Sequence, residues 1–184
     1  MKILQILAIL VFFAVNGYAN ISAFSEKENG WSQNGKLVPD TDNMKSKDGF
    51  GAQLWVINDD SFIEKWNKPE PPTVPVARTA KRNKPVFIIF FFINAGMDEK
   101  SQTDVFADVT ITGPDGKVIG VFKDIELWQG RNETPENNIQ LGVNQLDLTI
   151  EDTDLLGPYT IEAVVKDRVQ NIQLNLKTVL IAEE

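Results

Sequence analysis

The chain has 184 residues, of which 42% are hydrophobic, a formal net charge of −8, and neither cysteine nor histidine. This size allows one globular domain with a real core and is hardly enough for two. The missing residue types exclude thiol nucleophiles, serine–histidine triads, imidazole bases and the common zinc and haem sites, and the acidic charge is poorly matched to nucleic acid.

Residues 1–19 have the organisation of a secretory signal peptide. Lys2 gives a positive start, Ile3 to Val15 is apolar apart from Gln5, and Ala19 ends a stretch with small residues at the cleavage positions. An uncleaved membrane anchor is the alternative, but the apolar segment is shorter than the roughly 20 residues that a spanning helix needs. We therefore expect a bacterial protein that is periplasmic or secreted, with no membrane span after the signal is removed.

Residues 20–50 are polar and interrupted by glycines. They predict a loosely ordered N-terminus of the mature chain, in which Trp31 and Leu37-Val38 are candidates to dock on the domain. The folded domain is expected over residues 51–184.

The domain is expected to begin with a strand over residues 52–58 and a short helical turn near residues 61–67. The turn follows the Asp59–Ser61 segment, whose side-chain oxygens can cap a helix, and it would place Phe62, Ile63 and Trp66 on one face. The proline-rich segment 69–75 then ends the helix and predicts an extended connector.

A basic cluster follows the connector and consists of Arg78, Lys81, Arg82 and Lys84. It could bind an anionic partner, such as a lipid headgroup, a sugar acid or an acidic protein. The alternative is a solvated loop whose charges protect the next, strongly apolar strand from aggregation.

That strand, Val86 to Ile93, has no polar side chain. It is too short for a membrane helix, and a single strand cannot cross a bilayer with its backbone unpaired. Both of its faces are apolar, so the second face needs a cover. The first candidate is the segment from Phe62 to Trp66 with the proline connector; a protein partner or self-association through this strand, or a shorter strand, are the alternatives.

The rest of the chain alternates between apolar and polar residues in short segments separated by turns. The expected strands cover residues 104–112, 117–122, 125–128, 139–150, 158–165 and 172–181. Over 139–150 the alternation changes phase at Asn144-Gln145, which predicts a β-bulge or a strand break. No crossover helices are visible. The pattern therefore predicts an all-β, antiparallel β-sandwich of about seven strands.

Within this region, Asp115-Gly116 closes a hairpin, Leu156-Gly157-Pro158-Tyr159 leads into an alternating strand, and a final alternating strand ends the chain. These features over Val86 to Ala182 resemble immunoglobulin-like and fibronectin-III-like modules of bacterial exported proteins. The chain departs from true immunoglobulin domains in having no cysteine pair. The resemblance implies a binding or structural module with no catalytic set.

Two further groups could bind a ligand. The acidic turn with Asp152 and Asp154 offers oxygens for a weak calcium site, although aspartates also favour turns for backbone reasons. Trp128 is flanked by Gln129, Arg131 and Asn132, as is typical of a tryptophan that stacks on a sugar; core packing is the alternative.

The sequence thus predicts an exported binding or interaction module without catalytic activity or cofactor. Its candidate binding residues are Arg78, Lys81, Arg82, Lys84, Trp128 and Arg131. A carbohydrate-binding module is the alternative. A carboxylate-dependent hydrolase is less favoured, because no motif sets two carboxylates at a defined separation.

Overall fold

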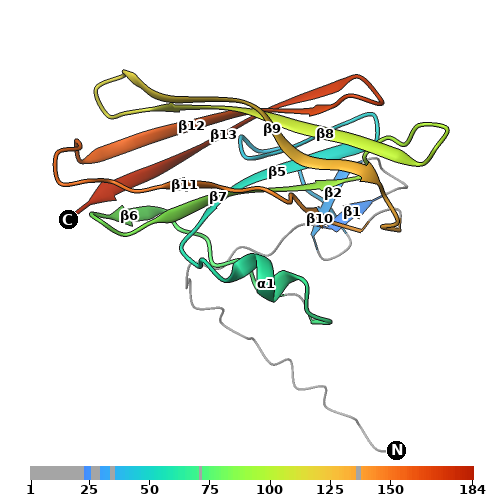
Figure 1. Ribbon diagram of the computed structural model, residues 1–184, viewed down its shortest axis with the longest axis horizontal. Coiled ribbons are helices and arrows are strands. Elements are labelled where there is room, and N and C mark those ends of the chain that lie inside the picture. Colours follow the sequence, from blue (N-terminus) through green and yellow to red (C-terminus); the bar gives the residue numbers. More distant parts are fainter. Residues whose placement is uncertain (1–22, 26–29, 34–35, 71, 136–137) are drawn as a thin grey trace, which may run out of the picture.

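The computed structural model describes residues 23–25, 30–33, 36–70, 72–135 and 138–184 (Figure 1). These residues form an all-β sandwich with one short helix, which confirms the predicted fold class. The predicted signal peptide lies outside the described residues. Among those described, no helix has the length and apolar character to cross a membrane.

Two five-stranded sheets form the sandwich. The first has the order β10 (Gln140–Leu141), β7 (Val86–Ile93), β5 (Phe50–Ile57), β4 (Met44–Lys47), with β11 (Leu146–Leu148) also paired to β7. The second has the order β6 (Thr79–Lys81), β13 (Ile172–Glu183), β12 (Gly157–Asp167), β8 (Gln102–Thr112), β9 (Val118–Arg131). All neighbours are antiparallel except β6 and β13.

The alternating segments place their apolar residues between the two sheets, as predicted. One core contains the inward residues of three strands of the second sheet. They are Val105, Ala107, Val109 and Ile111 of β8, Tyr159, Ile161, Ala163 and Val165 of β12, and Ile172, Leu174 and Leu176 of β13. Val86, Ile88, Phe90 and Phe92 of β7 face them from the other sheet. Burial of this apolar surface is the main stabilising term of a fold with no disulfide.

The opposite face of β7 is covered from within the chain. Phe87, Ile89 and Phe91 pack with Phe62 of α1 (Phe62–Trp66) and with Val74 of the proline connector. This confirms the first candidate for the cover, and α1 lies beneath this sheet in Figure 1. An uncovered second face was the reason for expecting a partner at Val86–Ile93, and that reason does not hold, since every residue of β7 is buried.

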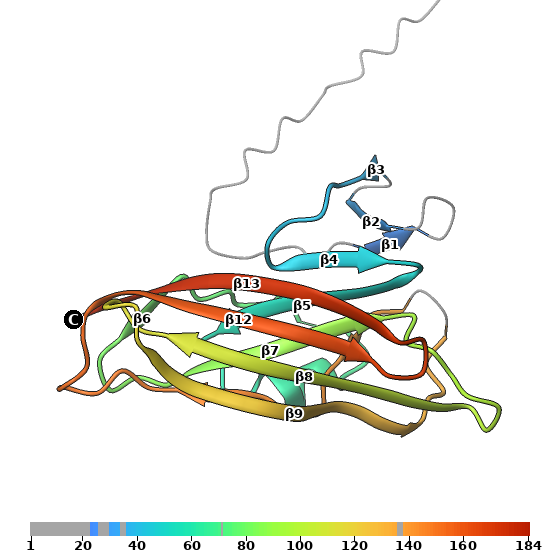
Figure 2. The same ribbon diagram turned by 90° about the horizontal axis from the view of Figure 1, so that it is seen from above.

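The segment 20–50, which we expected to be a loosely ordered N-terminus, contains strands in its described part. Its described residues include β1 (Ala23–Ser25), β2 (Gly30–Gln33) and β3 (Lys36–Leu37), and β4 pairs with β5 as part of the sandwich (Figure 2). Trp31 is fully buried with Met44 and Ile93, and Val38 packs against them. Burial of one large indole anchors a segment that has few other apolar residues.

The phase change predicted at Asn144-Gln145 is a break between β10 and β11. Leu141 is paired with Phe91 and Leu146 with Ile88, so four residues of one strand lie opposite two of β7. This confirms the interpretation of the pattern. The backbone N–H of Gly142 still donates to the carbonyl oxygen of Phe90 in β7 at 2.8 Å, whereas the N–H of Val143 turns to the other sheet and donates to the carbonyl oxygen of Leu127 in β9 at 2.9 Å.

Candidate functional site

A pocket of about 270 Å³ lies between α1, β10 and the C-terminal end of β9. Ten residues line it, and none of them is charged. They are Ile63, Trp66, Asn67, Trp128, Thr134, Ile139, Gln140, Leu141, Gly142 and Val143. Two tryptophans from segments far apart in the sequence therefore share one small, uncharged cavity.

Trp66 comes from α1 and is held against the outer face of β7. Its ring centroid is 4.9 Å from that of Phe91 at an interplanar angle of 51°, and 6.0 Å from that of Phe62. The turn before the helix is fixed by Asp59, which accepts hydrogen bonds from Lys65 Nζ at 2.5 Å and from the Ser61 backbone at 3.0 Å. The hydrogen bonds from Lys65 and Ser61 lower the pKa of Asp59 below its usual range. The predicted side-chain cap is wrong: Ser61 is the N-cap residue and makes no side-chain cap bond, and Asp59 binds Ser61 instead of the first turn of the helix.

Trp128 reaches the pocket because β9 contains a bulge. Val105 pairs with Trp128 and Phe106 pairs with Glu126, so Leu127 has no partner in the ladder to β8. Leu127 is fully buried in the core, and Trp128 is half-buried against the same core. The indole Nε1 of Trp128 is buried without a hydrogen-bond partner. An unsatisfied buried donor of this kind costs about 1–3 kcal/mol.

The polar side of the pocket is an amide network. Gln140 Nε2 donates to Asn132 Oδ1 at 2.8 Å and to Thr134 Oγ1 at 2.6 Å, and Asn132 Nδ2 donates back to Gln140 Oε1 at 3.3 Å. Both N–H donors of Gln140 are therefore used inside the protein. The Thr134 hydroxyl accepts one of these bonds, so its proton can be donated elsewhere.

The predicted basic cluster lies elsewhere, around β6 and the C-terminus. Arg82 Nε is 3.2 Å from Glu184 Oε1, and a second guanidinium nitrogen donates to the backbone oxygen of Glu151. Arg78, Lys81 and Lys84 are exposed. In Figure 1, β6 and the C-terminus lie at the end of the sandwich away from β10. The predicted site residues therefore do not form one site.

Arg131 is exposed and 3.4 Å from Glu133, and it does not line the pocket. Asp152 of the acidic turn accepts a hydrogen bond from Asn83 at 2.8 Å, and Asp154 accepts one from the Glu151 backbone at 2.8 Å. In the part of the chain that the structure describes, no group of three or more acidic side chains is arranged to hold a metal ion.

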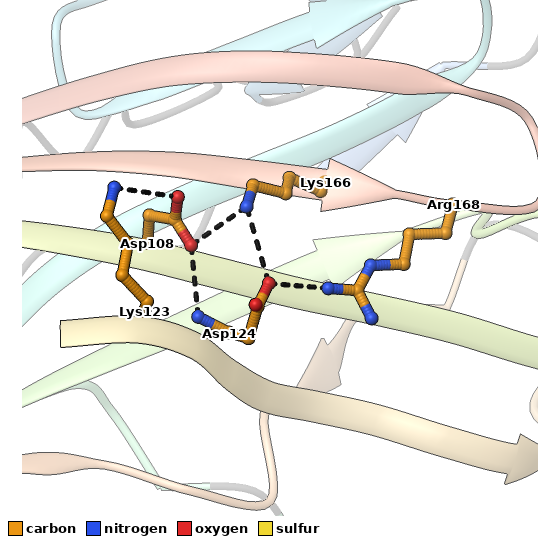
Figure 3. A network of polar contacts seen from close by, with 5 residues as sticks. All are labelled: Asp108, Lys123, Asp124, Lys166 and Arg168. Atoms are coloured by element: carbon orange, nitrogen blue, oxygen red, sulfur yellow. Dashed lines mark hydrogen bonds and ion pairs between the residues drawn. The ribbon is translucent and has the colours of Figure 1, made fainter.

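A network of five charged residues lies on the outer face of the second sheet (Figure 3). Asp108 accepts from Lys166 at 2.8 Å, from Lys123 at 3.0 Å and from the Asp124 backbone at 3.0 Å, while Asp124 also pairs with Arg168. Burial acts to raise the pKa of Asp108, but these hydrogen bonds outweigh it and hold the pKa well below its usual range. A glycosidase general acid needs the opposite shift.

Sequence reasoning selected Trp128 but not its partners across the pocket. Trp66 was expected in the cover for β7 and was not singled out as a site residue, and Thr134, Ile139, Gln140 and Val143 were not selected. No pattern in the sequence distinguishes these residues from other polar and apolar residues of the chain. The bulge at Leu127 and the break after Leu141 bring them together.

No protein-family model matches the chain. No curated protein matches it either.

Several solved structures show partial similarity to this chain. An alkylpurine DNA glycosylase of Pseudomonas fluorescens, solved with DNA containing an abasic site analogue, is 10% identical over 58% of this chain and 28% of its own, with a TM-score of 0.38. A family 123 glycoside hydrolase of Clostridium perfringens is 8% identical over 73% of this chain and 27% of its own, with a TM-score of 0.44. A Niemann-Pick type C2 protein of the Japanese carpenter ant is 8% identical over 71% of this chain and 89% of its own, with a TM-score of 0.38. The chain thus spans less than a third of the first two proteins, and we draw no functional conclusion from these similarities.

Proposed function

We propose that the chain is an exported, non-catalytic binding module, and that its binding site is the pocket between Trp66 and Trp128. The observation that carries this proposal is a small cavity lined by two indoles, Trp66 and Trp128, together with uncharged polar side chains. Small-ligand sites combine apolar and aromatic walls with a few polar groups that fix orientation. Export follows from the signal-like organisation of residues 1–19.

The absence of catalysis is supported by the chemistry of the lining residues. Among the described residues that line the pocket, none carries an acidic or basic group, and the Thr134 hydroxyl already accepts a hydrogen bond from Gln140. General acid–base work needs a titratable group within hydrogen-bond reach of the reacting atom. The charged network around Asp108 is saturated with internal ion pairs.

The basic cluster is the other surface that the sequence offered for a partner. Its most buried member, Arg82, is already engaged by Glu184 and by the Glu151 carbonyl. This internal use leaves Arg78, Lys81 and Lys84 as dispersed surface charges, and exposed charges of this kind contribute little on their own. The pocket is therefore the better-supported site.

Nuclear magnetic resonance of the processed, ¹⁵N-labelled chain tests the proposal, using a library of small uncharged fragments as probes. We expect saturable shifts of the indole N–H signals of Trp66 and Trp128, each assigned by a Trp→Phe variant. The Trp55 indole is an internal control, because its Nε1 donates to Gln53 Oε1 at 2.8 Å outside the pocket. The proposal is refuted if no fragment binds, or if binding shifts only signals of the basic cluster.

A further inference from the structure

We infer that the ligand of this pocket is an uncharged pyranose ring, stacked on indole and held by hydrogen bonds that the protein donates. This inference rests on the proposed function and adds the class of ligand. Three properties of the pocket carry it: its lack of charge, its uncharged polar groups and its size.

The lack of charge excludes an ionic ligand. None of the ten lining residues is acidic or basic, and the nearby Arg131 is paired with Glu133. A uronate, phosphate or ammonium group bound here would lose water without gaining an opposite charge, which is strongly unfavourable. The net charge of −8 adds a general repulsion for anions.

The uncharged polar groups of the lining favour a ligand that is rich in hydroxyl groups. Thr134 Oγ1 accepts from Gln140, so its remaining capacity includes a donated proton. Asn67 also lines the pocket, and an amide side chain offers both donors and an acceptor. A hydrocarbon in the pocket would leave these groups without partners from the ligand, whereas sugar hydroxyl and ring oxygens can bind them.

The size and walls of the pocket fit a single ring. Its volume of about 270 Å³ lies below the roughly 300–1,000 Å³ typical of sites for drug-sized ligands. An acyl chain would not be enclosed. Phe91 and Phe62 fix the Trp66 ring, and a rigid indole can stack on the apolar C–H face of a pyranose while its neighbours bind the hydroxyls.

The test titrates the processed chain with the methyl pyranosides of glucose, galactose and mannose and with N-acetylglucosamine. Glucuronate serves as the charged comparison and cyclohexanol as a ring with a single hydroxyl and no ring oxygen. At least one neutral pyranoside should shift the Trp66 and Trp128 indole signals saturably, and glucuronate should bind at least about tenfold more weakly, a difference of about 1.4 kcal/mol.

Two variants separate the contributions. Trp128→Ala removes one aromatic wall, and Thr134→Val removes a hydroxyl donor at nearly constant shape; each should weaken the pyranoside about tenfold. Trp55→Phe should leave binding unchanged, because Trp55 does not line the pocket.

The outcomes distinguish this inference from the proposed function. Binding of cyclohexanol or of other fragments without any pyranoside overturns the sugar inference and keeps the pocket as a binding site. Equal binding of glucuronate also overturns the inference. A chain that binds none of the probes overturns both proposals.

Discussion

Replacing Phe62 by alanine should expose the outer face of β7. Phe62 is only 1% exposed, and it lies in an apolar cluster with Phe87, Ile89 and Phe91. Its ring meets that of Phe91 edge-on, with centroids 6.2 Å apart. The side chain therefore connects α1 to the most apolar strand of the protein, and its removal leaves that strand with one face unprotected.

The expected loss of stability follows from this burial. Truncating a fully buried phenylalanine to alanine costs about 3–5 kcal/mol, which includes the loss of favourable ring contacts. α1 has only five residues and is followed by the proline connector, so the site can partly collapse. We therefore expect a value near the lower limit, about 3 kcal/mol.

Urea denaturation of the processed chain, followed by tryptophan fluorescence and circular dichroism, measures this loss. Glu64→Ala is the matched control, since Glu64 lies on the same helix and is exposed; it should change the free energy of unfolding by less than about 0.5 kcal/mol. Light scattering should also show association of Phe62→Ala at concentrations where the control is monodisperse, because an exposed apolar strand aggregates. A loss below about 1 kcal/mol with unchanged association would show that α1 does not protect β7.

Two further substitutions test the N-terminal anchor and the charged network. Gly51→Ala should destabilise the chain by about 1–3 kcal/mol, because overpacking strains a filled site and the new Cβ would lie 2.7 Å from Trp31 Cζ2. Gly113→Ala is the control, because its Cβ would meet nothing closer than 3.5 Å. Equal urea midpoints for the two variants would contradict the close packing around Gly51. Asp108→Asn should make the free energy of unfolding depend less on pH at acid pH. The pKa of Asp108 is lowered in the folded state. The carboxylate therefore stabilises the fold above its unfolded pKa of about 4, and this stabilisation is lost as the pH falls below that value. Urea midpoints at neutral and acid pH measure this, and parallel profiles for the two proteins would refute it.

The strands that alternate could be predicted from the sequence, because a half-buried strand shows its two faces directly as a period of two. This holds for β8, β12 and β13, whose inward residues are those expected. β7 has no alternation, yet its length and the need to cover two apolar faces led to α1 as the cover. In both cases a local pattern determines which surface must be buried, and the fold has few ways to bury it.

The N-terminal segment could not be predicted in the same way. β4 reads MKSK and carries one apolar residue, Met44, so its pairing with β5 depends on backbone hydrogen bonds that any sequence can make. Trp31 is buried because Gly51 leaves space for its ring against Ile93. The space is a property of two segments together, and neither segment alone indicates it.

The pocket depends on interruptions of regular structure, which is why only Trp128 was identified in advance. In a regular β9, Leu127 and Trp128 would point to opposite faces of the sheet. The bulge at Leu127 instead lets both contact the core, with Trp128 also at the pocket wall. The break after Leu141 lets Val143 join β9, so that the two sheets approach each other beside α1. Bulges are common next to binding sites because they redirect a side chain without changing the rest of the sheet. Removing the register shift would therefore be expected to turn Trp128 away from Trp66, which makes the bulge itself part of the proposed site.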